Sequence, residues 1–279
     1  MIDLLDALDV FLGETMRATK ERAVAKLRPG LQRDLARAFR KQGQIFVRKL
    51  SAIRDEWPVQ EERTRPDDMP EAVWNWLRQY WGETEAETVE DMIGPIARSR
   101  SVALTMGGES LAQALNMSMT FDLENPLAVA RVRDYGAKLV SNVNETTQGY
   151  IRTIIGNGLQ DGWSYDKVAR SLLDRFEEFA IGKPQEHIDS RAHLIAITEI
   201  GQAYEVGNAT VADDLRQAGL PMEKSWLTSR DDRTSAGCLE NQAVGWIPIE
   251  QAFPSGHMHP LRFPGCRCAA LYRRVGAGL

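Results

Sequence analysis

The stretch His257–Cys268 reads HMHPLRFPGCRC and holds two of the chain's three cysteines and two of its four histidines. The third cysteine, Cys238, closes the upstream segment Asp231–Cys238, which reads DDRTSAGC. Thiolates and imidazoles separated by turn-forming residues can converge on one tetrahedral zinc ion. This concentration of ligand-type side chains predicts that the C-terminal part of the chain folds around a common point.

Three cysteines and one histidine would complete a four-ligand structural zinc site. His259 is the preferred histidine, because the prolines that follow it stiffen its approach to the cysteines, and His257 is the alternative. The close pair is spaced C-x-C, whereas common zinc modules use two C-x-x-C knuckles. The predicted ligand set is Cys238, His259, Cys266 and Cys268.

Two other states of the cysteines stay open at this point. Small buried thiols pack like hydrophobic side chains and need no metal. A disulfide is the less favoured state, because the cysteine count is odd and the acidic N-terminus lacks the basic region of a secretion signal.

The order of several short motifs resembles that of the phage Mu F-like head morphogenesis proteins, which are minor capsid components. The resemblance covers roughly residues 126–274, and the closing C-R-C after a proline-rich turn is its most specific element. Relatives often carry His or a C-x-x-C pair at the place of Cys238, and often Asn at the place of Gly265. The motifs are Arg191, Ile197–Glu199, Lys224–Trp226, Asp231–Thr234, Cys238 and Pro264–Cys268.

The resemblance implies a minor capsid protein of a tailed phage or prophage that acts in procapsid assembly. It also implies a place in the virion, inside the capsid, after assembly in the host cytoplasm. The implied partners are the portal protein, capsid or scaffold proteins, and double-stranded DNA bound independently of sequence. No membrane contact is expected, and neither enzymatic activity nor a catalytic residue is predicted.

The alternative function is a zinc-dependent nuclease or other hydrolase acting on nucleic acid, because four polar residues lie near the candidate site. These residues are Asp231, Asp232, His257 and His259. Four protein ligands would leave zinc no open position for catalysis, and two-metal nucleases need several convergent carboxylates. Glu199 is predicted to form a structural ion pair rather than to serve as a catalytic carboxylate.

The predicted fold class is α+β and predominantly α-helical, with a small C-terminal β-sheet that carries the possible zinc site. A boundary near Glu124–Pro126 divides the chain into residues 1–125, a helical region, and 126–279, the Mu F-like domain. Apolar periodicity and capping residues predict three helices in the second part, followed by short strands. The helices are expected from 127 to about 155, after Ser164, and from Asp189 to Leu215, and the strands at 223–228, 245–249 and 267–275.

Charge is segregated in the N-terminal region. Residues 17–54 contain twelve Lys or Arg and two acids, and residues 55–91 contain twelve acids and three Arg. The apolar spacing predicts an amphipathic helix over 31–53 whose basic face could contact phosphates, lie in solvent, or pair with the acidic segment.

Trp74, Leu77 and Trp81 are predicted to share a helix face, in the core or as an anchor for a partner. The apolar stretch 101–121 is interrupted by polar residues, so no membrane span is expected.

Overall fold

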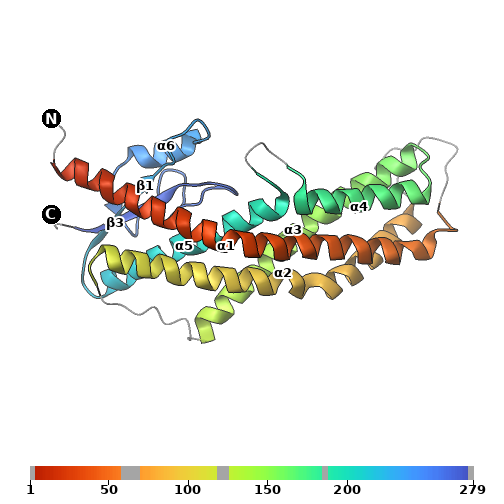
Figure 1. Ribbon diagram of the computed structural model, residues 1–279, viewed down its shortest axis with the longest axis horizontal. Helices are drawn as coiled ribbons and strands as arrows, with labels where there is room; N and C mark the ends of the chain where they lie inside the picture. The colour runs from red at the N-terminus through yellow and green to blue at the C-terminus, as the bar shows by residue number, and fades with distance from the viewer. Residues whose placement is uncertain (1–3, 58–69, 118–125, 184–187, 276–279) are drawn as a thin grey trace. The chain divides into compact units, whose positions relative to one another are not determined.

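The structure, a computed structural model, describes residues 4–57, 70–117, 126–183 and 188–275. It confirms the predicted fold class, since helices dominate and one small antiparallel sheet follows near the C-terminus (Figure 1). No helix in these ranges is long and apolar enough to cross a membrane. The elements are α1 (Leu4–Leu50), η1 (Ser51–Ile53), α2 (Glu71–Ala114), α3 (Pro126–Gln160), α4 (Tyr165–Ile181), α5 (Arg191–Gln217), β1 (Met222–Leu227), α6 (Ala236–Ala243), β2 (Ile247–Pro248) and β3 (Ala269–Arg274).

The chain forms two compact units that do not follow the sequence boundary near 125. The first unit combines residues 1–30, 98–130 and 194–279, and the second combines 31–97 and 131–193. Long helices pair along their lengths, so segments that are far apart in the sequence share one core. A boundary drawn from composition can only separate consecutive residues, and it therefore does not describe this arrangement.

The second unit is a helical assembly with an aromatic core. Phe46 packs edge-on against Trp81 with ring centroids 5.8 Å apart, and Trp81 also contacts Phe176. Leu77 and Trp81 are buried as predicted, whereas Trp74 is only partly buried and lies under the guanidinium of Arg152, 4.2 Å from the ring centroid. The tryptophan-rich segment thus contributes mainly to the core.

The basic residues of α1 in this unit pair with acidic residues of α2 and α4. Of the three possibilities left open for the basic face, pairing with the acidic segment is therefore observed for Lys41 and Lys49. Exposed pairs of this kind each stabilise the fold by about 0–1 kcal/mol, so together they favour one helix register more than they add stability. The pairs are Arg40–Glu177 at 2.7 Å, Lys41–Asp91 at 2.6 Å, Lys49–Glu83 at 2.9 Å, Lys49–Glu87 at 2.8 Å and Arg54–Asp166 at 2.6 Å.

Two predicted helix limits need correction. The helix that was expected to stop near 155 continues through its glycines to Gln160. A Cβ at Gly158 would lie 2.7 Å from a side-chain carbon of Val168, so glycine at this position permits close contact with α4. The next helix begins after Ser164, as predicted. The Ser164 side chain accepts a hydrogen bond from the Lys167 N–H. At α5, the capping side chain is Ser190, which accepts from the His193 N–H, and not the predicted Asp189.

In the first unit, α2 and α5 approach each other through glycines. A Cβ on Gly107 would lie 2.0 Å from the Tyr204 carbonyl oxygen, and a Cβ on Gly207 would lie 2.1 Å from that of Leu104. These distances leave no space for a side chain at either glycine. The helix α5 then ends at Gln217, and Gly219, with φ of +88°, follows as the C-terminal glycine that the sequence predicts.

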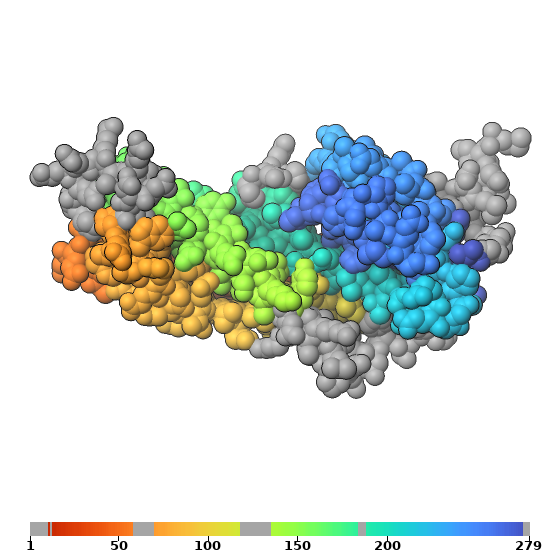
Figure 2. All heavy atoms as spheres, turned by 180° about the vertical axis from the view of Figure 1, so that it is seen from behind, coloured from red at the N-terminus to blue at the C-terminus, as the bar shows by residue number. Residues whose placement is uncertain are grey.

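The sheet of the first unit has the strand order β2–β1–β3, and both pairings are antiparallel. In the register of β1 and β3, Trp226 faces Ala270 and Lys224 faces Tyr272. The helix α6, between β1 and β2, lies where only a loop was expected; Ser235 occupies its N-cap position, and its side chain makes no capping hydrogen bond. Figure 2 shows the residues after about 220 gathered in one continuous part of the surface.

Candidate metal centre

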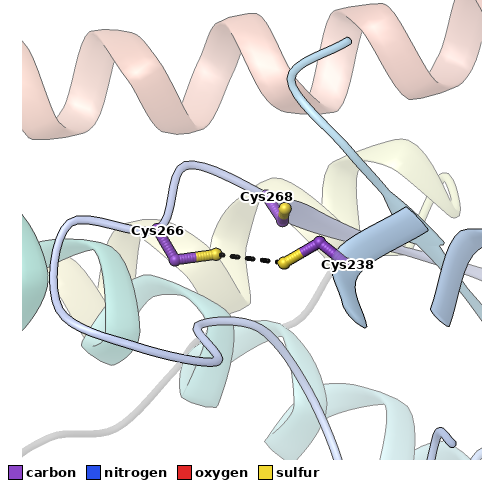
Figure 3. A group of neighbouring side chains, drawn as sticks. All are labelled: Cys238, Cys266 and Cys268. Atoms are coloured by element: carbon purple, nitrogen blue, oxygen red, sulfur yellow. Dashed lines mark hydrogen bonds between the residues drawn. The ribbon is translucent and has the colours of Figure 1, made fainter. Parts of the chain in front are cut away.

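The three cysteines converge, as the sequence predicts. Cys238 lies in the first turn of α6, Cys266 in the turn before β3, and Cys268 directly before that strand. Their sulfur atoms all lie within 4.8 Å of one another, and the side chains are 1%, 6% and 3% exposed. In Figure 3 the sulfurs of Cys238 and Cys266 point toward each other, with Cys268 beside them.

The spacing of the sulfurs fits a metal ion and is too long for a disulfide. The Sγ atoms of Cys238 and Cys266 are 4.0 Å apart, and all three thiols are free. A disulfide requires about 2.05 Å between its sulfurs. Thiolates bound to zinc at about 2.3 Å in tetrahedral geometry lie about 3.8 Å from one another. The three residues can therefore supply three ligands of one zinc ion with little movement.

The thiols also belong to a small apolar cluster. Trp226 and Phe253 pack in it with ring centroids 5.0 Å apart, and Ile247 completes its buried wall. The cysteines are thus packed like hydrophobic side chains, as expected if they are buried thiols. This packing is also compatible with a bound ion. Their convergence on one point gives the cluster its metal-binding geometry.

A tight turn places Cys266 beside the other two thiols. The Cys266 N–H donates to the Phe263 carbonyl at 3.0 Å, and Gly265 has φ of +80°. Proline followed by a residue with positive φ at the two central positions defines a type II turn. The Gly265 N–H also donates to the Thr198 hydroxyl at 2.9 Å, which attaches the turn to α5.

Arg267 ties the two cysteine-bearing segments together. It stands between Cys266 and Cys268, and its guanidinium pairs with the carboxylate of Asp231. The other carboxylate oxygen of Asp231 accepts from the Arg233 N–H at 3.2 Å. The hydrogen bond from Arg267 is the main reason that the pKa of Asp231 is lowered to about 2. The ion pair fixes the turn that leads into α6 and hence the position of Cys238.

Arg262 makes a second tie between these segments. A Cβ on Gly237, the residue before Cys238, would lie 2.9 Å from the Arg262 guanidinium carbon. The same guanidinium donates to the Ser235 hydroxyl at 3.4 Å. Glycine at position 237 therefore allows Arg262 to lie against the first turn of α6.

The electrostatics of the cluster favour formation of a first thiolate. Hydrogen bonding with the Cys268 thiol, opposed by burial, lowers the pKa of Cys266. The positive charge of Lys20 contributes in the same direction. The pKa of Cys268 is raised, by the same hydrogen bond and by burial. Since metal ions bind thiolates, this arrangement suits a metal site.

Neither predicted histidine joins the three sulfurs. Among the described residues, the cysteines alone form a group of three or more possible ligands. The Nδ1 atom of His257 lies 3.0 Å from both the hydroxyl and the carbonyl oxygen of Ser255. The Nδ1 atom of His259 lies 2.7 Å from the Pro260 carbonyl oxygen. The assignment of His259, or of His257, as the fourth ligand stays a prediction.

Two buried charged residues next to the cluster were not found from the sequence. The Lys20 ammonium group lies 2.8 Å from a carboxylate oxygen of Glu205 and 2.5 Å from the Cys268 carbonyl oxygen. The other carboxylate oxygen of Glu205 accepts from the Ala270 N–H at 3.1 Å. Lys20 precedes Cys268 by 248 residues, so no local pattern could reveal the contact.

The family-motif residues Glu199 and Arg191 have structural roles. Glu199 pairs with Arg100 at 2.5 Å, and both are almost fully buried, which agrees with the predicted structural ion pair. Burial raises the pKa of Glu199, and Arg100 opposes the shift. Arg191 donates to the Val143 carbonyl and stacks on Phe179, and burial lowers its pKa to about 10.

Lys224, another motif residue, holds the loop that follows β2. It is 2% exposed, and its ammonium group donates to the carbonyls of Ile249 at 2.8 Å and Met258 at 2.7 Å. The ammonium also lies 5.1 Å from the ring centroid of Phe253, a cation–π contact. Burial lowers the pKa of Lys224 to about 8, and the charge of Glu250 partly opposes this shift.

These features define a small α+β module in which three buried cysteines converge and could hold a metal ion. Residues 150–271, a little under half of the chain, match the family model described as Phage Mu protein F like protein. This part of the chain is Mu F-like, and the match confirms the resemblance found in the motifs. No curated protein and no solved structure matched the chain.

Lys224 gives the stability of this module a defined pH dependence. Its pKa is about 8 in the folded chain and 10.5 when unperturbed. Between these values the unfolded chain binds more protons, so the contribution of Lys224 to the free energy of unfolding rises with pH. Below about pH 8 the folded chain bears the full cost of burying the charged ammonium group. Between about pH 8 and pH 10.5 this cost disappears, and the free energy of unfolding rises by at most on the order of 3 kcal/mol.

This dependence can be measured by denaturant unfolding of the wild type and Lys224→Met at pH 7.5 and pH 10. The wild type should gain stability relative to the variant at the higher pH. Lys26→Met, which alters an exposed lysine on α1, should show no such difference. A wild-type advantage that stays constant or shrinks with rising pH would contradict the assignment.

Proposed function

We propose that this protein is a minor capsid protein that acts in procapsid assembly of a tailed phage or prophage, with a structural zinc ion in its C-terminal module. The main support for the proposal is the way in which the residues of the Mu F-like motifs come together in the fold. Their cysteines form one buried cluster, and their charged residues hold the surrounding segments in place. This is the arrangement of a module built for stability and contacts.

Zinc would occupy the space between Cys238, Cys266 and Cys268, with His259 as the proposed fourth ligand. His259 is favoured over His257 because its ring has fewer hydrogen-bond partners. Within the described residues, the His259 ring contacts only the carbonyl of the neighbouring Pro260. The ring of His257 instead contacts Ser255, which in turn bonds to Asn241. A bound zinc ion would stabilise a sheet that has little apolar core of its own.

The alternative function, a metal-dependent nuclease, finds less support in the site. The carboxylate of Asp231 is engaged by Arg267 and Arg233, and these positive charges oppose the binding of a second cation. Within the described ranges, no other group of three or more His, Cys, Asp or Glu side chains converges. A two-metal mechanism requires such convergent carboxylates.

The proposed partners are the portal protein and capsid or scaffold proteins, and the proposed location is the interior of the virion. Contact with double-stranded DNA, independent of sequence, is a further proposal that rests on the basic residues of α1. Several of these residues already pair with acids of α2 and α4. A DNA phosphate would have to displace those carboxylates, so we place protein contacts before DNA contacts.

The metal proposal predicts that freshly prepared, chelator-free protein contains close to one zinc ion per chain. Cys266→Ser and Cys268→Ser should each lower the zinc content and the solubility, because a buried sheet would lose its support. Elemental analysis of the purified protein measures the content. Cys238→Ser should behave in the same way. Absence of zinc from the wild-type protein would leave the cysteines as packing residues.

The assembly proposal predicts no DNA cleavage in the presence of Mg²⁺, Mn²⁺ or Zn²⁺. A plasmid-nicking assay on the full chain tests this directly. Asp231→Ala and His259→Ala serve as the decisive variants if cleavage is seen. Cleavage that disappears in these variants would replace our proposal with the nuclease function.

The partner proposal predicts that the full chain co-purifies with a portal protein encoded beside it. The association should survive digestion of DNA with a nuclease, because it depends on protein surfaces. A complex that dissociates after digestion would show that DNA bridges the two proteins. Absence of the portal from both preparations would contradict the proposed association.

A further inference from the structure

The side chain of Lys20 connects the helix α1 to the segment that carries Cys268. In Figure 3 the ribbon of α1 passes beside the three cysteines. The Lys20 ammonium group donates to the Cys268 carbonyl and pairs with Glu205 of α5. Lys20 is 4% exposed and Glu205 is fully buried, so both charges have left water. A contact at this point joins the N-terminal helix, α5 and the last strand.

The buried pair needs both of its partners. Isolated charges in an apolar interior are costly, and removal of one member of a buried pair leaves the other uncompensated. Glu205 is held further by the Ala270 N–H. The position of Lys20 on α1 is thereby fixed relative to the strand that follows the cysteines.

A metal ion would change the charge balance at this point, an argument that rests on the proposed zinc site. A divalent ion with three thiolates and a neutral fourth ligand carries a net charge of about −1. Lys20 supplies a buried positive charge next to this site, because its ammonium group donates to the Cys268 carbonyl.

We infer that Lys20 couples metal binding at Cys238, Cys266 and Cys268 to the docking of α1. The ammonium group compensates the negative charge of the loaded site, and in return the loaded site holds Lys20 in place. Because such coupling is reciprocal, whatever detaches this part of α1 must weaken the metal site, and loss of metal must loosen α1. The metal centre would then control the N-terminal helix as well as the local sheet.

The first experiment measures zinc affinity of the full chain by competition with a chromophoric chelator. Lys20→Met should bind zinc at least 10-fold more weakly than the wild type, which is the range seen when groups outside the ligand shell are removed. Lys26→Met, an exposed lysine on the same helix, is the matched control and should bind within about 2-fold of the wild type. Equal affinity of Lys20→Met and the wild type would overturn the inference.

A second variant separates charge compensation from simple structural support. Glu205→Gln also breaks the ion pair but keeps the Lys20 charge beside the thiolates. Under our inference this variant binds zinc as tightly as the wild type or more tightly, because the loaded site replaces the lost carboxylate as the counter-charge. A loss equal to that of Lys20→Met would show that the pair serves only to hold the fold, and would overturn the inference.

The reciprocal effect is read from hydrogen exchange of the backbone. Removal of zinc from the wild type should increase exchange in the α1 segment around Lys20, and this response should be absent in Lys20→Met. A wild-type chain that binds no zinc would defeat the metal proposal itself. Zinc binding without any change in exchange of α1 would defeat the coupling alone.

Discussion

The buried pair of Lys20 and Glu205 satisfies the polar backbone at the start of the last strand. β3 lies at one end of the sheet order and pairs with β1 alone. Its Ala270 N–H donates to Glu205, and the preceding Cys268 carbonyl accepts from Lys20. Unpaired backbone groups at this depth would cost about 1–3 kcal/mol each. Two side chains thus replace the partner strand that this edge lacks.

The cysteine cluster depends on that satisfied edge. Cys266 and Cys268 flank Arg267 at the entry to β3, so any shift of the strand would move two of the three sulfurs. Cys238 arrives from another segment, and the Arg267–Asp231 pair and the packing of Arg262 on Gly237 hold that segment in place. The sulfurs are therefore positioned by groups that would not bind the metal themselves.

Packing constraints act at a larger scale in α2 and α5. Their glycines bring the two backbones so close that no side chain fits between them. The same first unit holds the buried Arg100–Glu199 pair, whose acidic member belongs to the Mu F-like motifs. The motif residues Glu199, Lys224 and Arg267 thus share one property. Each is a charged side chain whose partner fixes the position of a neighbouring segment.

The sequence by itself determined the class of fold, most of the helices and strands, and the convergence of the three cysteines. The helices and strands follow from local periodicity, capping residues and turn chemistry, which are encoded within a few residues of each other, whereas the convergence of the cysteines was inferred from their residue type. The type II turn at Pro264–Gly265 and the cap at Ser164 are examples. The family resemblance depended on the same short motifs.

Only the tertiary structure decided which distant residues meet. No local signal reveals the contact of Lys20 with Glu205 or the pairing of Glu199 with Arg100. The same holds for the combination of separate segments into two units. Such contacts are selected when the whole chain collapses and buried charges must find partners. The sequence names the charged residues, but their partners are set by helix packing over hundreds of residues.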